Sequence, residues 1–238
     1  MTAPVYLLQS EADVAPGDEW LTSAERERLA AFPVEKRRRD WRLGRWTAKR
    51  LLAALDGVSP TEDGLRRYTV WPTASGVPVA HKEGASLPRR ISLSHSHGIA
   101  LVLAGEPPAA HPTLAFVLGC DLERIEPRVR GFEEDYLTER ERAHVAAAPL
   151  RDLATTLFWT GKESVMKALG EGLRLAAQSV EVEPTSDWPV AGGPLVPFAV
   201  RRPTNDLEGR WGILLGLAAA LVTPLGSDEP IRLDFPAI

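Results

Sequence analysis

The sequence predicts an α+β protein made of two pseudo-symmetric lobes, each a small antiparallel sheet packed with helices. Segments with helical spacing of apolar residues alternate with short strand-like runs bounded by glycine and proline. The order of these segments also partly repeats. LTSAERERLAAF at 21–32 returns as LTERERAHVAAA at 137–148, and RDW…WTAKR at 39–50 returns as RDL…WTGKE at 151–163. The offset stays between 112 and 116 residues, which indicates an internal duplication.

Composition places the chain among ordinary globular proteins, with 44% hydrophobic and 25% charged residues. Cys120 is the only cysteine, which excludes an internal disulfide and fits a cytoplasmic protein. The start of the sequence lacks the pattern of a signal peptide, and the longest apolar run, Ile213–Val222, is too short to cross a bilayer. We expect that run to be a buried strand and the protein to have no membrane partner. A net charge of −4 gives no reason to expect nucleic-acid binding.

The first half opens with a short strand expected at Tyr6–Gln9. A helix should begin near Thr22, because Thr22 and Glu25 have the spacing of a capping box, and it should end before Pro33. The next helix is strongly basic, since 36–50 reads KRRRDWRLGRWTAKR, with eight basic residues and one acidic residue. Its apolar residues recur at three- and four-residue steps, so it is predicted to be amphipathic, with Lys49 on a basic stripe.

The basic side of this helix has three interpretations. It is a solvated surface, a nucleic-acid surface, or a phosphate site in which a few forked guanidiniums contact phosphate oxygens. The acidic remainder of the chain argues against nucleic acid. We favour the phosphate site for Arg45 together with Arg37 or Arg38.

Residues 57–88 are rich in glycine, proline and polar residues, with short extended pieces expected at Tyr68–Trp71 and Val77–Ala80. Ile91–Ala104 reads as a strand, a tight turn at His97-Gly98 and a second strand. The composition of 106–112 is that of a linker. We therefore predict an N-terminal lobe at 1–105, a linker at 106–112 and a C-terminal lobe at 113–238.

The second half carries the acidic residues on which the functional prediction depends. Leu114–Leu118 reads as a buried strand, followed by Asp121 and Glu123, which point to the same side if the backbone is extended. A helix is expected from Trp159 to Leu169, ended by Gly170 and Gly172, and it places Trp159, Glu163 and Lys167 on one face.

Each of these motifs alone has an ordinary structural explanation. A Glu–Lys pair four residues apart is commonly a solvated salt bridge, and Asp-x-Glu is commonly a polar loop. Together, three carboxylates and Lys167 have the composition of a Mg²⁺ site that faces a phosphate. Trp159 is expected to pack, and Lys162 either helps to neutralise phosphate or is solvated. Because Arg50 stands where the second repeat has Glu163, we interpret the lobes as offering cations on one side and carboxylates on the other to a phosphate-bearing ligand between them.

The compound pattern GCDLE at 119–123 followed by W-x-x-K-E-x-x-x-K-A-x-G-x-G-L at 159–173 resembles the signature of the Sfp-type 4′-phosphopantetheinyl transferases. The resemblance implies the fold of that family and transfer of the 4′-phosphopantetheine arm of coenzyme A to a serine of an apo acyl- or peptidyl-carrier protein, with Mg²⁺, releasing 3′,5′-ADP. Whether the carrier serves fatty acid, polyketide or non-ribosomal peptide synthesis stays open.

The resemblance also implies residue roles. Asp121, Glu123 and Glu163 would bind the metal, and Lys167 would stabilise the pyrophosphate. The base would be Glu163, ranked first, or a water bound to the metal. The residues implied in coenzyme binding are Arg37, Arg38, Arg45, Gly76, Pro78, Ser94, His95, Asp121 and Lys167. The chain departs from the family at Val77, where a cation is usual; Arg89 or Arg90 are candidates to replace it.

The carrier protein would dock near 119–130 and the helix from 138, with Arg124, Arg128 and Arg130 as candidate contacts. A monomer is expected, because the duplication supplies both halves of the ligand site. Two other functions are compatible with the sequence. One is a different Mg²⁺-dependent phosphoesterase or nuclease, and the other is a non-catalytic protein that binds coenzyme A or the carrier, to which only Val77 points.

Overall fold

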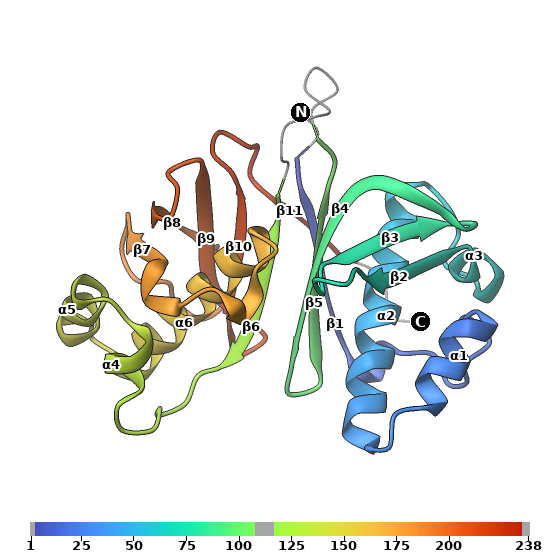
Figure 1. Ribbon diagram of the computed structural model, residues 1–238, viewed down its shortest axis with the longest axis horizontal. Coiled ribbons are helices and arrows are strands. Elements are labelled where there is room, and N and C mark those ends of the chain that lie inside the picture. Colours follow the sequence, from blue (N-terminus) through green and yellow to red (C-terminus); the bar gives the residue numbers. More distant parts are fainter. Residues whose placement is uncertain (1–2, 108–116, 235–238) are drawn as a thin grey trace. The chain divides into compact units, whose positions relative to one another are not determined.

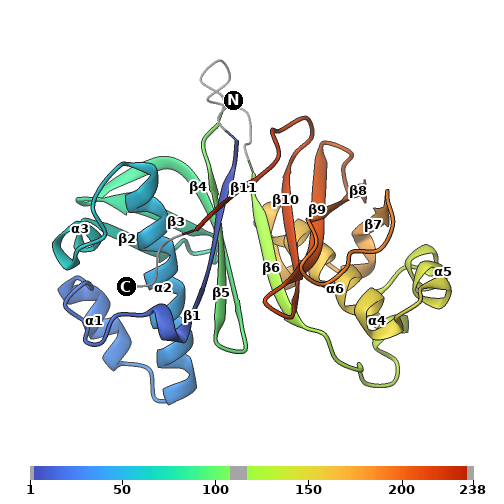
Figure 2. The same cartoon turned by 180° about the vertical axis from the view of Figure 1, so that it is seen from behind.

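The computed structural model describes residues 3–107 and 117–234. These residues divide into two compact units, one formed by 1–116 with 228–238 and the other by 117–227. Each unit combines a sheet with helices, so the predicted α+β class is confirmed (Figures 1 and 2). Most of the predicted linker, from residue 108 onward, lies outside the described residues.

The first unit contains a six-stranded sheet with the order β11-β1-β5-β4-β3-β2. Its strands are β1 (Val5–Ser10), β2 (Tyr68–Pro72), β3 (Pro78–Lys82), β4 (Ala85–Ser96), β5 (Ile99–Gly105) and β11 (Ile231–Leu233). Neighbours are antiparallel except β1 and β11, which are parallel. The predicted turn joins β4 to β5 through His97 and Gly98, both at positive φ (48° and 75°). Because β11 pairs with β1, this last strand belongs to the first unit, whereas the sequence assigned 113–238 to the second lobe.

The helical part of this unit consists of η1 (Glu11–Asp13), α1 (Ser23–Ala30), α2 (Glu35–Leu55) and α3 (Glu62–Arg66). The amphipathic α2 packs against the sheet and buries its apolar face there (Figure 1). The predicted capping box is present, since Thr22 Oγ1 accepts from Glu25 N and Glu25 Oε2 accepts from Thr22 N. The five-residue α3 was not predicted, because one turn within a glycine-rich segment has no measurable period.

Lys49 is the main correction in this unit. The sequence placed it on the basic stripe beside the apolar face, but its side chain is buried and its Nζ lies 2.5 Å from Glu25 Oε2. Lys49 also donates to the carbonyl of Trp20 at 3.1 Å. A lysine can be buried this deeply only when its charge is paired and hydrogen-bonded. The pair therefore fastens α1 to α2.

The second unit contains a five-stranded antiparallel sheet with the order β6-β10-β9-β8-β7. Its strands are β6 (Gly119–Arg124), β7 (Glu181–Pro184), β8 (Val196–Arg202), β9 (Leu207–Leu214) and β10 (Leu217–Pro224). The predicted strand at 114–118 is not observed at 117–118, and 114–116 lie outside the described residues. The run Ile213–Val222 is not one strand, because a turn with positive φ at Leu215 and Gly216 separates β9 from β10.

The helices of this unit are α4 (Phe132–Tyr136), α5 (Glu139–Ala147) and α6 (Arg151–Ala168), with short turns η2 (Gly172–Arg174) and η3 (Ala177–Ser179). The helix α6 begins eight residues earlier than the predicted start at Trp159 and packs against β6, β9 and β10 (Figure 1). Its apolar side contributes Leu157, Phe158 and Val165 to the core.

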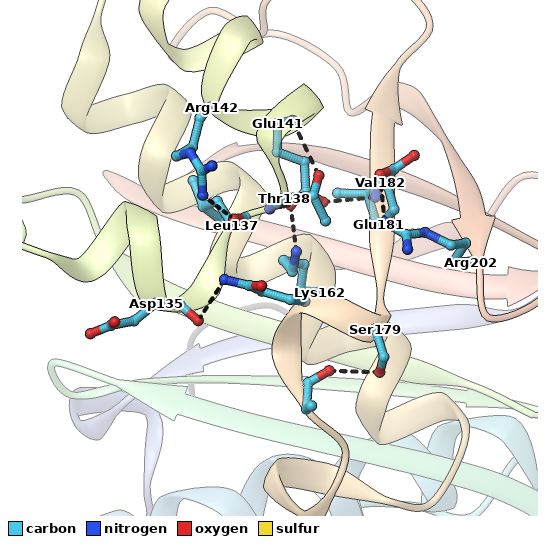
Figure 3. Close-up of polar contacts among 12 residues, drawn as sticks. Asp135, Leu137, Thr138, Glu141, Arg142, Lys162, Ser179, Glu181, Val182 and Arg202 are labelled. Carbon is cyan, nitrogen blue, oxygen red and sulfur yellow. Dashed lines mark hydrogen bonds and ion pairs between the residues drawn. The ribbon is translucent and has the colours of Figure 1, made fainter.

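A second buried ion pair holds α5 to α6. Glu141 forms the capping box of α5 with Thr138, as predicted, and its Oε2 is paired with Lys162 of α6 (Figure 3). Its Oε1 accepts from the backbone N–H of Val182 in β7 at 2.9 Å. Lys162 is thus neither solvated nor available to a phosphate, which corrects the expectation for this residue. The pair corresponds to Glu25–Lys49 in the first unit, as a duplicated architecture requires.

Among the helices of the described residues, none is both long and apolar enough to span a membrane.

Gly119 generates the first prediction. A Cβ on Gly119 would lie 1.8 Å from the carbonyl oxygen of Ser164 and 2.8 Å from the amide nitrogen of Ala168, both backbone atoms of α6. We expect Gly119→Ala to force β6 away from α6 and to lower the free energy of unfolding by about 1–3 kcal/mol, the usual cost of overpacking. Gly44→Ala in α2 is the control, because a Cβ there meets nothing within 4 Å. It should stabilise the protein by about 0.5–1 kcal/mol in the same urea titration; equal stability of both variants would refute the close approach.

The second prediction concerns Asp56, the residue that follows α2. Burial alone would raise its pKa, but hydrogen bonds from Lys82 (2.6 Å), Tyr68 (2.7 Å) and Arg89 (3.0 Å) outweigh burial and lower the pKa to about 2. A lowered folded-state pKa contributes stability that is complete above the unfolded value near 4 and is lost as the pH falls towards 2. We expect Asp56→Asn to lose about 1–2 kcal/mol at pH 7 and to flatten the stability profile between pH 4 and 2. A profile parallel to that of the wild type would contradict this assignment.

Candidate functional site

The close contact between β6 and α6 brings together the side chains that the sequence singled out. Asp121 and Glu123 lie within β6 itself, not in a loop after a strand, and they share one face because they are two residues apart. Lys167 Nζ reaches Asp121 Oδ1 at 2.5 Å and lies 3.8 Å from Glu163 Oε2. The lysine therefore bridges a carboxylate of the strand and a carboxylate of its own helix.

Trp159 has the packing role expected of it. Its indole is buried and contacts the rings of Phe132 and Tyr136 edge-on, with centroid distances of 5.4 and 5.0 Å. Both partners belong to α4, so Trp159 attaches that short helix to α6 one turn before Glu163. Aromatic pairs in this geometry contribute about 0.5–1.5 kcal/mol beyond the area they bury.

Glu163 has the most unusual electrostatic environment of the cluster. Burial is the largest cause and, together with the charges of Asp121 and Glu123, raises the pKa of Glu163 to about 7, although Lys167 and Arg128 oppose the shift. Burial would lower the pKa of Lys167, but the negative charges around it, Asp121 foremost, raise it instead. At neutral pH the lysine is therefore charged, while the glutamate is poised between its two forms. A carboxylate in that state is suited to accept a proton.

Glu123 has a cationic partner that sequence reasoning did not assign to it. Burial and then the charge of Asp121 raise the pKa of Glu123, and Arg128 opposes the shift. Arg128 Nη2 lies 3.4 Å from Glu123 Oε2, whereas the sequence offered Arg128 only as a contact for a partner protein. A separation of five residues across an irregular segment carries no periodic signal, so only the folded chain reveals this pair.

The donor set fits a hard divalent cation in its chemistry. All three candidates are oxygen donors. Burial is the main cause that raises the pKa of Glu123 and of Glu163, and the neighbouring carboxylates add a smaller repulsion that positive charge would relieve. In the described part of the chain, however, no three His, Cys, Asp or Glu side chains are arranged to hold a metal ion. Lys167 and Arg128 instead hold Asp121 and Glu123.

The candidate phosphate ligands of the first unit lie on α2. Arg37 is exposed, and Arg38 donates to the carbonyl of Phe32 at 2.7 Å. Arg45 differs from both, because its guanidinium lies 4.8 Å from the centre of the Trp41 ring and its Nε is buried without a hydrogen-bond partner among the described residues. Burial is the main cause that lowers the pKa of Arg45 to about 10. An arginine desolvated without a direct ion pair is a candidate anion site.

The remaining candidates are placed as follows. Gly76 forms the turn between β2 and β3 at φ 89°, and Pro78 is the first residue of β3. Ser94 is buried and His95 is exposed near the end of β4. These residues, with Arg37, Arg38 and Arg45, belong to the first unit, and the carboxylates belong to the second.

Arg89, one of the two candidates to replace a cation at Val77, forms ion pairs within the first unit. It is already paired with Asp56 at 3.0 Å and with Glu106 at 2.5 Å. Arg90 is exposed on the same strand.

Known proteins resemble this chain in the segment that carries the carboxylate cluster. Residues 117–203, which contain the whole cluster, match the sequence model of the 4′-phosphopantetheinyl transferase superfamily. A solved structure similar to part of the chain is that of Thermotoga maritima holo-[acyl-carrier-protein] synthase, at 24% identity and a TM-score of 0.37. The alignment covers 45% of this chain and 62% of that protein. No curated protein matches the sequence significantly. The match shows that residues 117–203, with the motifs that they contain, are similar to the 4′-phosphopantetheinyl transferase superfamily.

Proposed function

We propose that the protein transfers the 4′-phosphopantetheine arm of coenzyme A to a serine of an apo acyl- or peptidyl-carrier protein and releases 3′,5′-ADP. The superfamily match supports the reaction class. The observation that carries the proposal is the position of Lys167 between Asp121 and Glu163, because it places a cation, a structural carboxylate and a potential base within one partly buried cluster.

The chemistry is a displacement at phosphorus. The serine Oγ forms a bond to the phosphorus that bears the pantetheine arm, and the bond from that phosphorus to the bridging oxygen breaks, leaving the charge on the departing ADP phosphate. Glu163 takes the serine proton, for which its raised pKa near 7 is suited. The ammonium of Lys167 stabilises the negative charge of the leaving phosphate. Mg²⁺ held by Asp121, Glu123 and Glu163 would supply further neutralisation of the pyrophosphate.

Coenzyme binding is assigned to the first unit. Arg45, with Arg37 or Arg38, would bind the 3′-phosphate, and forked guanidiniums suit this role. Ser94 and His95, with the turn at Gly76 and Pro78, would contact the rest of the nucleotide. The exposed position of His95 and the incomplete hydrogen bonding of Arg45 support these roles. We further propose that the enzyme is a cytoplasmic monomer whose macromolecular partner is the carrier protein.

A direct assay tests the function. The protein is incubated with coenzyme A, Mg²⁺ and an apo carrier, and the carrier is then weighed by mass spectrometry. A gain equal to the phosphopantetheine arm supports transfer. Cleavage of coenzyme A without any carrier would instead indicate a phosphoesterase, and binding without turnover would indicate a non-catalytic homologue.

Replacing the base gives the sharpest test of the residue roles. We expect Glu163→Gln to lower the transfer rate by about 10²–10⁴-fold, because the amide cannot accept the serine proton. The fold should survive, since the amide matches the neutral form of a carboxyl whose pKa is already raised.

Glu27→Gln provides the control, because Glu27 is exposed on α1 and the same substitution there lies outside the carboxylate cluster. Its rate should equal that of the wild type. Circular dichroism should show that both variants are folded. If Glu163→Gln then transfers the arm at the wild-type rate, Glu163 is not the base.

The 3′-phosphate assignment is tested by binding. We expect Arg45→Met to weaken coenzyme A binding about tenfold in isothermal titration calorimetry, the usual size for the loss of a charge-assisted contact. Binding of dephospho-coenzyme A, which lacks that phosphate, should be unchanged. Arg39→Met, at an exposed position of the same helix, is the control. An equal loss for both ligands would show that Arg45 acts elsewhere.

A further inference from the structure

Arg128 is a cation of the second unit that the proposed mechanism does not use. Its Nη2 lies 3.4 Å from Glu123 Oε2, and its guanidinium lies 5.2 Å from the centre of the Phe132 ring. The side chains of Arg128 and Glu123 are only 17% and 28% exposed. The pair is thus more sheltered than ordinary surface salt bridges, whose contribution is near zero to 1 kcal/mol.

Arg128 packs against the ring of Phe132, which is itself packed against other aromatic rings. Phe132 contacts Tyr136 at 4.8 Å and Trp159 at 5.4 Å between ring centroids, and Trp159 lies one helical turn before Glu163. A continuous series of contacts therefore runs from α6 through α4 to Arg128 and ends on Glu123. The guanidinium is held at the carboxylate cluster by a rigid support.

One hydrogen-bond donor of the Arg128 guanidinium has no partner among the described residues. That donor is Nε, which is buried. A buried donor without a partner costs free energy. An arginine needed only to fasten a loop would be expected to satisfy that donor with a nearby carbonyl.

The charge balance of the cluster affects how strongly it attracts a divalent cation. Asp121, Glu123 and Glu163 carry up to three negative charges, and Lys167 with Arg128 offsets two of them. A divalent cation that enters this cluster gains less net attraction than three unpaired carboxylates would give, and it competes with the guanidinium for Glu123 Oε2. The attraction would increase if a phosphate ligand entered with the metal, because the phosphate adds the missing negative charge.

We propose that Arg128 is a competing counter-cation, which occupies Glu123 in the metal-free protein and weakens binding of a divalent ion that arrives without its phosphate ligand. This inference rests on the proposed metal role of Asp121, Glu123 and Glu163. Arg128 is a residue that sets metal affinity through Glu123, not one that contacts reacting atoms.

Titration with Mn²⁺, with the free ion followed by electron paramagnetic resonance, tests the proposal in the full-length protein. Arg128→Met removes the charge but keeps a flexible apolar side chain against Phe132. We expect it to bind Mn²⁺ about three- to tenfold more tightly than the wild type. The difference in Mn²⁺ affinity between Arg128→Met and the wild type should become smaller when coenzyme A is present. Arg128→Lys, which keeps the charge, should stay closer to the wild type than Arg128→Met.

Arg130→Met is the matched control, since Arg130 is exposed two residues away and its loss changes the net charge equally. Its Mn²⁺ affinity should equal that of the wild type. Unchanged or weaker affinity in Arg128→Met, or tighter binding in both variants, would overturn the proposal.

Asp121→Asn combined with Glu163→Gln separates this inference from the function on which it rests. If these changes abolish Mn²⁺ binding while Arg128→Met leaves affinity unchanged, the metal site is right and the role of Arg128 is wrong. If the wild type binds no Mn²⁺, or binding survives the double change, the metal assignment itself fails and the inference fails with it.

Discussion

The candidate site depends on how closely one strand approaches one helix. Gly119 lets the backbone of β6 touch the backbone of α6, where any side chain would collide with the carbonyl of Ser164. At that separation Lys167 of the helix reaches Asp121 of the strand, and Glu163 enters the electrostatic field of both carboxylates of β6. A larger separation would leave two ordinary solvated pairs. Burial raises the pKa of Glu163 most, and this contact between backbones adds the charges of Asp121 and Glu123 to that effect.

The two units share a scaffold and differ where the chemistry is placed. In each unit the glutamate of a capping box turns inward and pairs with a buried lysine of the long helix, Glu25 with Lys49 and Glu141 with Lys162. Removing one member of such a pair is costly, because it leaves the other charge buried. The residue after the lysine differs between the units: it is Arg50 in the first and Glu163 in the second. The duplicated ion pair therefore fixes the helix, while the adjacent position carries the divergence.

The carboxylates are balanced by cations on both sides. Lys167 holds Asp121 from the helix, and Arg128 holds Glu123 from the loop after β6, supported by the ring of Phe132. The charges of the cluster are therefore partly neutralised within the second unit. In the described residues, no three acidic side chains are positioned around one point to hold a metal ion.

Local sequence patterns determined much of this protein. The capping boxes at Thr22 and Thr138, the amphipathic α2 and the hairpin at His97-Gly98 were all predictable, because each depends on residues close in sequence. The repeat and the motifs at 119–123 and 159–173 also indicated the superfamily. Tertiary structure decided the rest. It buried Lys49 and Lys162, divided Ile213–Val222 into two strands, placed Asp121 and Glu123 inside β6, and paired Arg128 with Glu123. Periodicity shows which face of an element a residue occupies, but the partner opposite that face is set only when distant segments pack.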